Sequence, residues 1–343
     1  MESYLTGRTQ KVRVGSATSK TENLQSGVPQ GGILSPVIFI IYGADFEKWL
    51  KHATAFAYAD DSTTSVSDKD FEEIKRKLQE DAENVLQFMA SNGLVANPSK
   101  TVFMILGDRS ANGEMHENES IRVGKEDVKA TQTANVLGIF IDKNQKWTTH
   151  LHKLVTALDR RLYQIRRMAA KISKPGLRKI SDSLWTSKLR YGLQLCTEVR
   201  SNEAQSKNTE LIKVQRAQNR LLRVLTNTRK GDHTRIADML TETANLSVNQ
   251  TAAQIKLLEM WKASNNQDYP IKMEKIRQES GGPNTRSNLT TKFKEEGRTN
   301  VMKHSFVGDS ARLWNRAPTC IKMAKKISSA KLEIRKYVTT LPV

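Results

Sequence analysis

The pattern of apolar residues changes near His150, and this change most limits what the chain can fold into. Before it, short apolar runs alternate with polar and glycine-containing loops, as in domains that combine strands and helices. After it, apolar residues recur at helical spacing. A chain of 343 residues is long enough for two or more domains. We therefore expect an α+β part over residues 1–150 and a mostly α-helical part after it.

The stretch AFAYADDSTTSV places two adjacent carboxylates, Asp60 and Asp61, between two β-forming runs. Residues 55–58 and 63–66 predict paired strands, which leaves both aspartates at the connecting turn. Two unit charges about 4 Å apart repel by roughly 1 kcal/mol in water and about 4 kcal/mol at an effective dielectric of 20. The pair is therefore either solvated, as in an ordinary polar turn, or compensated by a bound cation, and these residues alone leave both interpretations open.

The sequence before this hairpin predicts a strand over residues 4–14 and then a polar loop. The glycine-rich run QSGVPQGGILSP opens into an apolar helix despite Pro36 near its start. Glycines in the run let the backbone approach a ligand closely, and Pro29 stiffens it. A glycine-rich turn that merely caps a helix has the same pattern, because the Gly-Lys-Ser/Thr ending of a phosphate-binding P-loop is lacking.

A long amphipathic helix is predicted after the hairpin, with Ser67 as N-cap, Asp70 three residues on and Gly93 at its end. Its apolar face is Phe71, Ile74, Leu78, Val85 and Met89. The run NPSKTVFMIL then predicts a turn into a strand, and ANVLGIFID predicts a further strand. The first 150 residues therefore alternate loops, strands and helices, as in an α+β domain.

Two amphipathic helices with basic faces are predicted after His150. The first has an apolar stripe at Leu151, Leu154, Leu158, Leu162 and Ile165, and is broken at Pro175 and Gly176. The second covers residues 211–225. Their interleaved arginines are Arg160, Arg161, Arg166, Arg167, Arg216, Arg220 and Arg223. Residues 266–304 read as a polar linker, and residues 305–343 as a helical tail that docks Leu313 and Trp314.

Charge is distributed unevenly within the net +19 of the chain. Residues 1–150 hold 17 Lys and Arg against 20 acids, whereas residues 151–230 hold 19 against 5. A basic segment of this kind suits a phosphate backbone, and a solvated basic surface is the alternative. Cys196 and Cys320 belong to no CxxC motif, which indicates neither a disulfide framework nor a zinc site and favours a reducing compartment. No membrane span or secretion signal is predicted.

Four motifs stand in one order along the chain: SGVPQGGILSP, AYADD, NGLVANPSKTVFMILG and LGIFIDKNQKWTTH. Together they resemble the palm of reverse transcriptases from non-LTR (LINE-type, jockey-like) retrotransposons. The resemblance covers roughly residues 3–155, continues weakly through a basic helical thumb, and returns in ARLWNRAP of the tail. It implies an incomplete palm at 1–150, which is an antiparallel sheet with helices on one face. It also implies a thumb or connection at 151–265, a linker at 266–304 and a C-terminal extension at 305–343.

The resemblance implies RNA-directed DNA polymerase activity with two Mg²⁺ ions, an RNA template, a DNA primer and deoxynucleotide triphosphates. Asp60 would be the principal metal ligand, supported by Asp61, and Lys100 would serve the pyrophosphate. Tyr58 would lie near the primer end, although packing of a strand aromatic in the core is as good an explanation. Gly27, Pro29, Gln30 and Gly31 would face the incoming nucleotide and template, and Leu137 and Gly138 the primer. Lys100 could equally be a solvated lysine. An intracellular ribonucleoprotein, nuclear or cytoplasmic and not secreted, is expected.

One carboxylate of the family pattern is not found. Such polymerases need another Asp, on a strand that precedes the glycine-rich loop, and the only acids before Asp60 are Glu2, Glu22, Asp45 and Glu47. We therefore expect a truncated polymerase that lacks its fingers and first catalytic strand. Three hypotheses follow: an active polymerase domain, a catalytically dead remnant that binds nucleic acid through its basic helices, and a basic protein with no nucleic-acid role.

Overall fold

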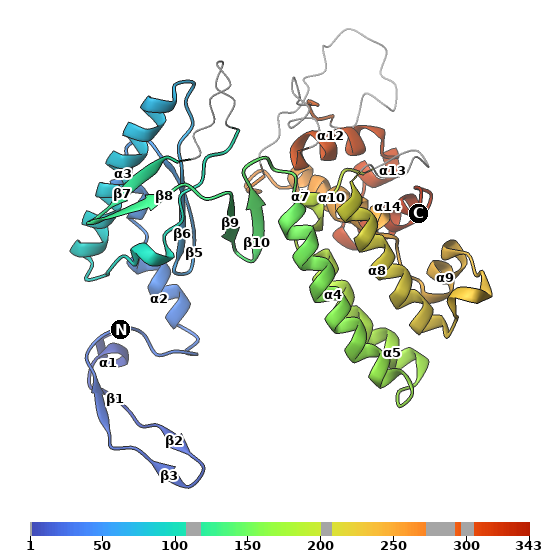
Figure 1. The fold of residues 1–343 in the computed structure, drawn as a ribbon, viewed down its shortest axis with the longest axis horizontal. Helices are drawn as coiled ribbons and strands as arrows, with labels where there is room; N and C mark the ends of the chain where they lie inside the picture. The colour runs from blue at the N-terminus through green and yellow to red at the C-terminus, as the bar shows by residue number, and fades with distance from the viewer. Residues whose placement is uncertain (1, 108–117, 200–207, 272–291, 296–304) are drawn as a thin grey trace. The chain divides into compact units, whose positions relative to one another are not determined.

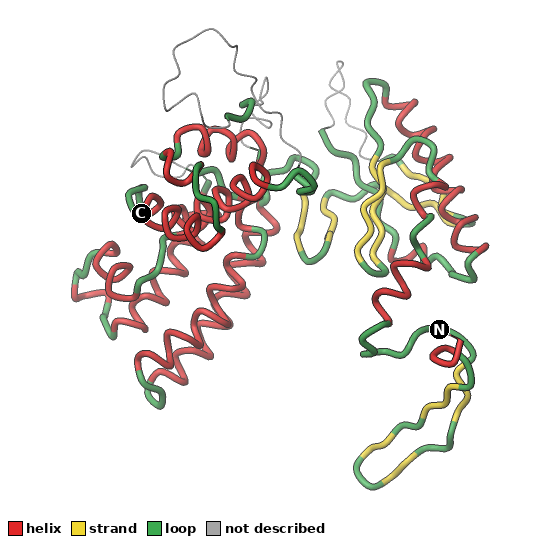
Figure 2. Tube along the Cα trace, turned by 180° about the vertical axis from the view of Figure 1, so that it is seen from behind, coloured by secondary structure: helices red, strands yellow, loops and turns green. Residues whose placement is uncertain are grey.

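The computed structural model describes residues 2–107, 118–199, 208–271, 292–295 and 305–343 (Figure 1). The chain divides into two compact units, Met1–Leu137 and Gly138–Val343. The first unit mixes short strands with helices, and the described part of the second is mostly helical (Figure 2). The expected mixture of helix and antiparallel strand is confirmed. The assignment of residues 1–150, 151–265, 266–304 and 305–343 to functional domains stays a prediction.

The N-terminal segment is a short helix followed by a two-stranded ribbon. Helix α1 (Glu2–Leu5) precedes β1 (Arg8–Gln10), β2 (Arg13–Val14), β3 (Ala17–Thr18) and β4 (Glu22–Leu24). Strand β1 pairs antiparallel with β4, and β2 with β3. The predicted strand over residues 4–14 is therefore wrong at its start, because the first of these residues belong to α1 and the strand hydrogen bonding begins only at Arg8.

The glycine-rich loop opens into helix α2 (Ser35–Tyr42), as expected. Pro36 lies in the first turn, where a missing N–H leaves no helical hydrogen bond unmade. A 3-10 turn, η1 (Phe46–Trp49), follows. Ile33, just before α2, is exposed, and so are Ile40 and Ile41 within it. These apolar side chains therefore do not contribute to the core of this unit.

Helix α3 (Phe71–Ser91) is the longest element of the first unit. Its N-cap is Asp70, whose side chain accepts a hydrogen bond from the Glu72 N–H, so the predicted cap at Ser67 is wrong. Gly93, with φ 64°, follows the end of the helix as predicted. On the buried face, Phe88 packs against Phe46 and Trp49 with ring centroids 5.2 and 6.0 Å apart.

The strands of the first unit pair in twos. Strands β5 (Thr54–Tyr58) and β6 (Asp61–Ser65) form one antiparallel pair, and β7 (Ser120–Val123) and β8 (Glu126–Lys129) another. The expected single antiparallel sheet is therefore not seen among the described residues. The run after NPSKT was predicted to be a strand. The predicted turn before it is present as the 3-10 turn η2 (Pro98–Lys100), but the run itself forms no strand and makes one isolated bridge, from Phe103 to Ala130.

The run ANVLGIFID contains two strands, β9 (Thr133–Val136) and β10 (Ile139–Asp142), where one was predicted. Between them Leu137 has φ 50° and Gly138 has φ 78°. Two successive left-handed residues reverse the chain direction, as in the tight turns that join neighbouring strands. This is why a continuous apolar run does not form one continuous strand.

The two basic helices are present in the second unit as predicted. They are α4 (Thr148–Ala169) and α8 (Thr209–Thr226), which lie side by side (Figures 1 and 2). The break after α4 is confirmed, but Pro175 and Gly176 lie in the first turn of α5 (Lys174–Ser181) and not in the break itself. A π-helical turn η3 (Asp182–Thr186), α6 (Ser187–Arg190) and α7 (Leu193–Cys196) lead towards α8.

The core of the second unit lies between these helices. The apolar stripe of α4 is buried, and it packs with Trp185, Val214, Leu221 and Leu225. Burial of such a side chain contributes about 2 kcal/mol. Beyond α8 come the 3-10 turn η4 (Lys230–Asp232), α9 (Ile236–Thr243) and α10 (Val248–Asn265).

The C-terminal tail docks on α10 through a second core cluster. Its helices are α12 (Phe306–Arg316), α13 (Thr319–Lys322) and α14 (Ile327–Val338). Trp314 and Leu313 are buried there, as predicted. Phe293, inside the predicted polar linker, is also buried against Trp314, and Asn315 holds its backbone by two hydrogen bonds of 3.1 and 2.9 Å. The predicted linker is therefore packed at Phe293, and its residues 272–291 and 296–304 lie outside the described part.

Candidate active site

The two aspartates lie at the tip of the β5–β6 hairpin. Tyr58 pairs with Asp61 at the end of a five-residue antiparallel register, so Ala59 and Asp60 form the turn and Asp61 opens β6. The prediction that both aspartates lie in the turn is thus correct for Asp60 only. Both carboxylates are exposed, and Tyr58 is 68% exposed, so its alternative interpretation as a core aromatic is wrong.

The turn itself is strained at Ala59. This residue has φ 53°, in the left-handed region that residues with a Cβ adopt at a cost of roughly 1–2 kcal/mol. The ladder on both sides of the turn holds Ala59 in this conformation, because the Tyr58 and Asp61 backbones are paired. The direction of the Asp60 and Asp61 backbones is therefore set by the hairpin and not by either aspartate alone.

Asp81 of α3 anchors the start of the hairpin. Its carboxylate accepts backbone N–H bonds from Lys51 at 2.8 Å, His52 at 2.9 Å and Ala53 at 2.6 Å, the three residues that precede β5. Asp81 is only 1% exposed. Burial by itself raises the pKa of this carboxyl, but the three backbone donors outweigh burial and the pKa lies below its ordinary value. The buried carboxylate thus fixes where β5 begins.

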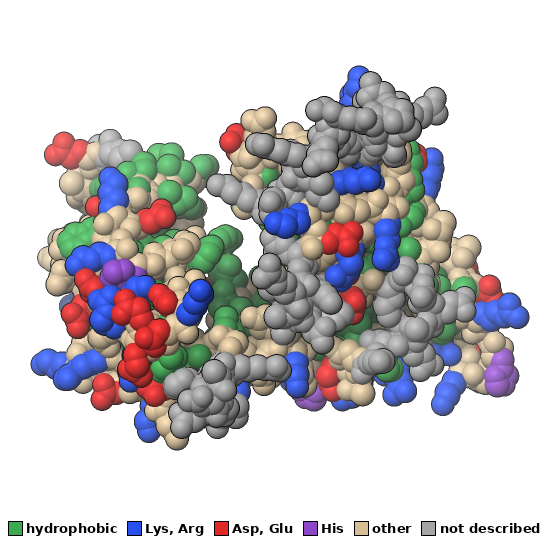
Figure 3. Space-filling view, turned by 90° about the horizontal axis from the view of Figure 1, so that it is seen from above, with side chains coloured by type: hydrophobic (Ala, Val, Ile, Leu, Met, Phe, Trp, Pro, Cys, Tyr) green, Lys and Arg blue, Asp and Glu red, His purple; other side chains and the backbone are tan. Residues whose placement is uncertain are grey.

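A layer of ion pairs surrounds this anchor. Glu80 accepts bonds from Lys51 Nζ at 2.7 Å and from His52 Nε2 at 3.0 Å, and these bonds lower the pKa of Glu80 to about 2. Arg76 pairs with Glu73 at 2.7 Å on the next turn of α3. Figure 3 shows acidic and basic side chains gathered with a histidine on the surface of the first unit. Exposed pairs of this kind contribute little each, so Asp81 is the main anchor.

Mg²⁺ is the cation that the donor atoms of the hairpin tip suit, because it prefers carboxylate and phosphate oxygens and keeps several waters. Asp60 and Asp61 provide two such carboxylates. Within the described ranges, no group of three or more His, Cys, Asp and Glu side chains is placed to hold a metal ion. Asp60 and Asp61 therefore provide oxygen atoms of the type that a divalent ion binds, and they supply only part of its ligands.

The glycine-rich loop is held by its own hydrogen bonds. The Pro29 carbonyl accepts bonds from the Gly32 N–H at 3.1 Å and from Ser35 Oγ at 2.6 Å. Gly31 has φ 80°, which favours glycine there, and a Cβ on Gly32 would lie 2.3 Å from the Tyr4 hydroxyl. Arg8 Nη2 donates to the Gly27 carbonyl at 2.5 Å. Gln30 is exposed between these fixed points.

The remaining residues that the resemblance named lie on separate elements. Lys100 is exposed at the end of η2, whose N-cap Asn97 accepts a bond from the Ser99 N–H at 3.1 Å. Leu137 and Gly138 form the connection between β9 and β10. Among the described residues, no hydrogen bond or ion pair joins Lys100, Gln30 or Gly27 to Asp60 or Asp61. The structure therefore brings together Tyr58, Asp60 and Asp61 on one hairpin, and the other residues named from the resemblance belong to other elements.

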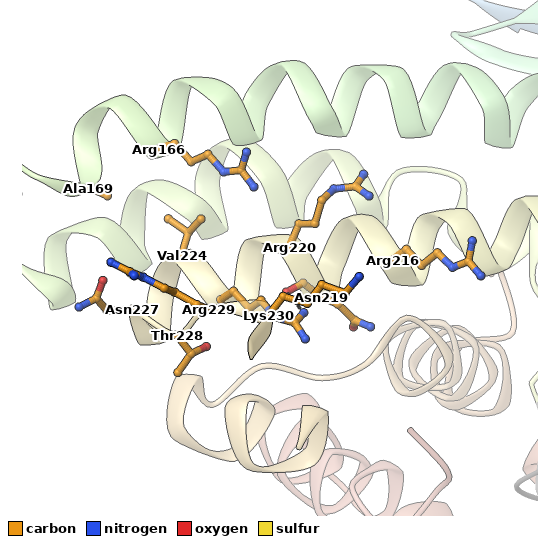
Figure 4. Close-up of a pocket in the computed structure, with 11 residues that line it drawn as sticks. Arg166, Ala169, Arg216, Asn219, Arg220, Val224, Asn227, Thr228, Arg229 and Lys230 are labelled. Atoms are coloured by element: carbon orange, nitrogen blue, oxygen red, sulfur yellow. Dashed lines mark hydrogen bonds between the residues drawn. The ribbon is translucent and has the colours of Figure 1, made fainter. Parts of the chain in front are cut away.

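The basic helices carry a pocket of about 980 Å³. Figure 4 shows Arg166 on α4 and Arg216 and Arg220 on α8 around it, together with Arg229 and Lys230 from the segment after α8. Arg223 also lines it. Of the arginines named from the sequence, Arg160, Arg161 and Arg167 do not line the pocket, and Arg161 instead donates to the Leu184 carbonyl.

Sequence reasoning missed several of the residues that build these sites. Asp81 occupies a position on the apolar stripe of α3, between Leu78 and Val85, and an acid on an apolar stripe is a signal that could have found it. Arg229 and Lys230 follow the predicted basic helix directly. Their place beside Arg166 depends on the packing of α4 against α8, for which no local signal exists.

Comparison with known proteins finds a family that the N-terminal part of the chain matches. Residues 1–141 match the family described as reverse transcriptase (RNA-dependent DNA polymerase). This range includes the glycine-rich loop, the β5–β6 hairpin and Lys100. No solved structure matches the chain.

Two curated relatives come from Drosophila melanogaster. The probable RNA-directed DNA polymerase from transposon X-element is 21% identical over 239 residues, which are 66% of this chain and 24% of the relative. The probable RNA-directed DNA polymerase from transposon BS is 27% identical over 187 residues, which are 52% of this chain and 20% of the relative. The alignments thus span about a quarter or less of the length of these relatives. Residues 1–141 are therefore similar to reverse transcriptases, and the chain as a whole is similar to parts of two transposon RNA-directed DNA polymerases.

Proposed function

We propose that this chain provides the catalytic hairpin of an RNA-directed DNA polymerase that copies an RNA template onto a DNA primer. The observation that carries the proposal is the pair of exposed carboxylates, Asp60 and Asp61, at the anchored tip of the β5–β6 hairpin inside the family match. Because the alignments cover only a fifth to a quarter of the two relatives, the proposal concerns this part of such a polymerase.

In the proposed reaction the primer 3′-hydroxyl attacks the α-phosphate of a deoxynucleotide triphosphate. A new phosphodiester bond forms, the bond between the α- and β-phosphates breaks, and pyrophosphate and the hydroxyl proton leave. Reverse transcriptases generally use divalent metal ions, and two Mg²⁺ ions would supply charge neutralisation to the attacking and leaving oxygens. Asp60 is the proposed principal ligand and Asp61 the supporting one.

The role of the chain itself is to hold these carboxylates in place before substrate arrives. The paired strands and the Asp81 anchor support this role, since a fixed charge costs no reorganisation during the reaction. We place Tyr58 near the primer end, because it is exposed and pairs with Asp61. A palm at residues 1–150 and a helical thumb at residues 151–265 complete this proposal, with the tail at 305–343 packed on α10.

Three further parts of the chain are proposed, from the family resemblance, to contact the substrates. The loop with Gly27, Pro29 and Gly31 would present Gln30 to the incoming nucleotide and template, and its fixed hydrogen bonds support that role. The Leu137–Gly138 turn would position the primer. Lys100 would contact the pyrophosphate, a task that suits its exposed point charge.

The basic helices would hold the RNA template and DNA primer through backbone phosphates. The proposed residues are Arg160, Arg161, Arg166, Arg167, Arg216, Arg220 and Arg223. The excess of 19 basic over 5 acidic residues between 151 and 230 supports this role, because release of counterions from nucleic acid favours binding.

A second candidate function is nucleic-acid binding without polymerisation. It is favoured by the ligand set of the described residues, in which the hairpin tip supplies two carboxylates and no cluster of three is found. A chain that lacks one metal ligand would keep its basic helices and lose the charge compensation that phosphoryl transfer needs.

The test is primer extension on an RNA template with Mg²⁺, using the full chain and two variants. Asp60→Asn removes a carboxylate charge from the hairpin tip, and Asp127→Asn makes the same change at an exposed aspartate of β8 as a matched control. We expect extension by the wild-type chain, a loss of at least ~100-fold in Asp60→Asn, and no loss in Asp127→Asn. Binding of RNA against salt concentration is measured in parallel.

Two results would contradict the polymerase proposal. Equal extension by Asp60→Asn and the wild-type chain would show that the hairpin tip holds no catalytic metal ligand. Salt-sensitive RNA binding without any extension by the wild-type chain would establish the second candidate function.

A further inference from the structure

We propose that the pocket between α4 and α8 binds single-stranded RNA, with its guanidinium groups on backbone phosphates and one unstacked nucleotide in the recess. This site extends the proposed function, because it rests on the basic helices binding nucleic acid, and it names the form of nucleic acid that they take. Throughout this section the α4–α8 pocket means the recess lined by Arg166, Ala169, Arg216, Asn219, Arg220, Arg223, Val224, Asn227, Thr228, Arg229 and Lys230.

The α4–α8 pocket concentrates positive charge that the protein does not neutralise. Six of its lining residues are Lys or Arg. Arg220 is paired with Asp159 of α4 at 2.5 Å, and in the described part of the chain the other five cations have no ion pair. Like charges this close repel one another, so a ligand with several negative charges would relieve a cost that the folded protein carries.

The lining is held in place by the fold. Leu158, Leu162 and Ile165 of α4 pack under it against α8, and all three are buried. At the end of α8, Asn227 has φ 57° and the Thr228 N–H donates to the Arg223 carbonyl at 3.0 Å. The backbone of the following residue is fixed as well, because the Arg229 N–H donates to Asp232 at 2.6 Å. A site that is already ordered loses less entropy when it binds.

The shape of the α4–α8 pocket indicates more than a phosphate contact. A recess of about 980 Å³ exceeds what one phosphate group fills, and Ala169 and Val224 give it apolar surface. Guanidinium planes stack on unpaired bases, and side-chain amides hydrogen-bond to base edges. Asn219 Oδ1 already accepts a bond from Gln215 Nε2 at 2.9 Å, which leaves the amide hydrogens of Asn219 for a ligand.

Single-stranded RNA fits this lining better than a duplex does. A duplex keeps its bases stacked and paired, so it would meet the cations at the rim with its phosphates and leave the recess unfilled. A single strand can turn one base out at little cost and satisfy both the cations and the amides.

The test measures binding of a labelled, unstructured RNA oligonucleotide to the full chain by fluorescence anisotropy, at several salt concentrations. The same sequence as a blunt RNA duplex is the comparison ligand. Arg166→Ala removes a pocket cation. Arg235→Ala removes an exposed arginine at the N-cap of α9, outside the pocket and outside the proposed phosphate contacts, and is the matched control. Asn219→Ala removes an amide without changing charge.

We expect the single strand to bind more tightly than the duplex. Arg166→Ala should weaken single-strand binding about tenfold and lower the slope against log salt by about 0.7, while Arg235→Ala changes affinity less than about threefold. Asn219→Ala should weaken binding with the salt slope unchanged, because no phosphate contact is lost. Thermal unfolding of each variant checks that the fold is intact.

Four results would overturn the inference. Equal losses in Arg166→Ala and Arg235→Ala, or duplex binding as tight as single-strand binding, would indicate a diffuse basic surface, and the nucleic-acid role in the proposed function would stand. Unchanged affinity in Asn219→Ala would exclude the nucleotide in the recess. No RNA binding at low salt would overturn both the pocket and the nucleic-acid role, while the primer-extension test of Asp60 would still judge the hairpin.

Discussion

Lys256 Nζ and Asp309 Oδ2 lie 2.5 Å apart, and both side chains are buried. The pair joins α10 to α12 and so fixes the C-terminal tail on the second unit. Lys256 also donates to the Thr197 carbonyl at 2.6 Å, and Asp309 Oδ2 accepts the Val199 N–H at 3.0 Å. Burial lowers the pKa of Lys256, and the Asp309 charge opposes that shift. Three segments that are distant in sequence thus meet at one ion pair.

Lys256→Met should lower the free energy of unfolding by about 3–5 kcal/mol, because it leaves the Asp309 carboxylate buried without its charge partner. The double variant Lys256→Met with Asp309→Leu should recover much of that loss. Lys262→Met, which breaks the partly exposed pair with Glu259, is the control and should cost about 1 kcal/mol or less. Urea unfolding measures all three. If Lys256→Met is as stable as Lys262→Met, the buried pair contributes nothing to the free energy of unfolding.

Asp81→Asn should destabilise the first unit by about 1–3 kcal/mol, because one amide oxygen cannot replace two carboxylate oxygens for three backbone donors. The pKa of Asp81 lies below its unfolded value, so its stabilisation is present above about pH 4 and is lost as pH falls through the folded pKa. Unfolding at pH 7 and pH 3 measures both effects. The exposed Glu83→Gln on the same helix is the control, and an equal effect there would contradict the anchoring role.

Ala59→Val should destabilise the hairpin by about 1–2 kcal/mol, because a β-branched side chain fits poorly at φ 53°. Ala59→Gly should be close to neutral, since relief of the left-handed strain is offset by the greater freedom of glycine in the unfolded chain. Ala57→Val in the extended part of β5 is the control and should be tolerated. Thermal unfolding separates the three, and equal stability of both valine variants would argue against strain at the turn.

The stability of the second unit should fall as pH drops below about 6.5, through His150 of α4. His150 Nδ1 accepts the Phe140 N–H of β10 at 3.3 Å, and burial, together with the Lys188 charge, lowers the pKa of His150. The unfolded chain therefore binds this proton more readily, so the stabilisation is complete above about pH 6.5 and is lost as pH falls towards the folded pKa.

His150→Gln should remove that pH dependence, whereas His152→Gln, at an exposed position of the same helix, should leave it in place. Unfolding in urea at pH 7.5 and pH 5.5 checks the difference. If the pH dependence of unfolding survives in His150→Gln, groups other than His150 cause it.

The sequence by itself determined the elements whose signals are local. Helical spacing marked α4 and α8, two β-forming runs around Asp60 and Asp61 marked the β5–β6 hairpin, and the order of short motifs marked the resemblance to reverse transcriptases. Each signal lies within a few residues along the chain, because side-chain periodicity and turn chemistry follow directly from neighbouring residues.

Only the tertiary structure decided the contacts between distant segments. Asp81, in the middle of α3, accepts hydrogen bonds from the residues before β5. Phe293, which lies in a polar stretch of sequence, packs on Trp314, and Arg229 lines a pocket with Arg166. These relations depend on how helices pack, and packing is a property of whole surfaces that meet. A local pattern therefore predicts that a residue is basic or buried, and only the folded chain decides which partner it meets.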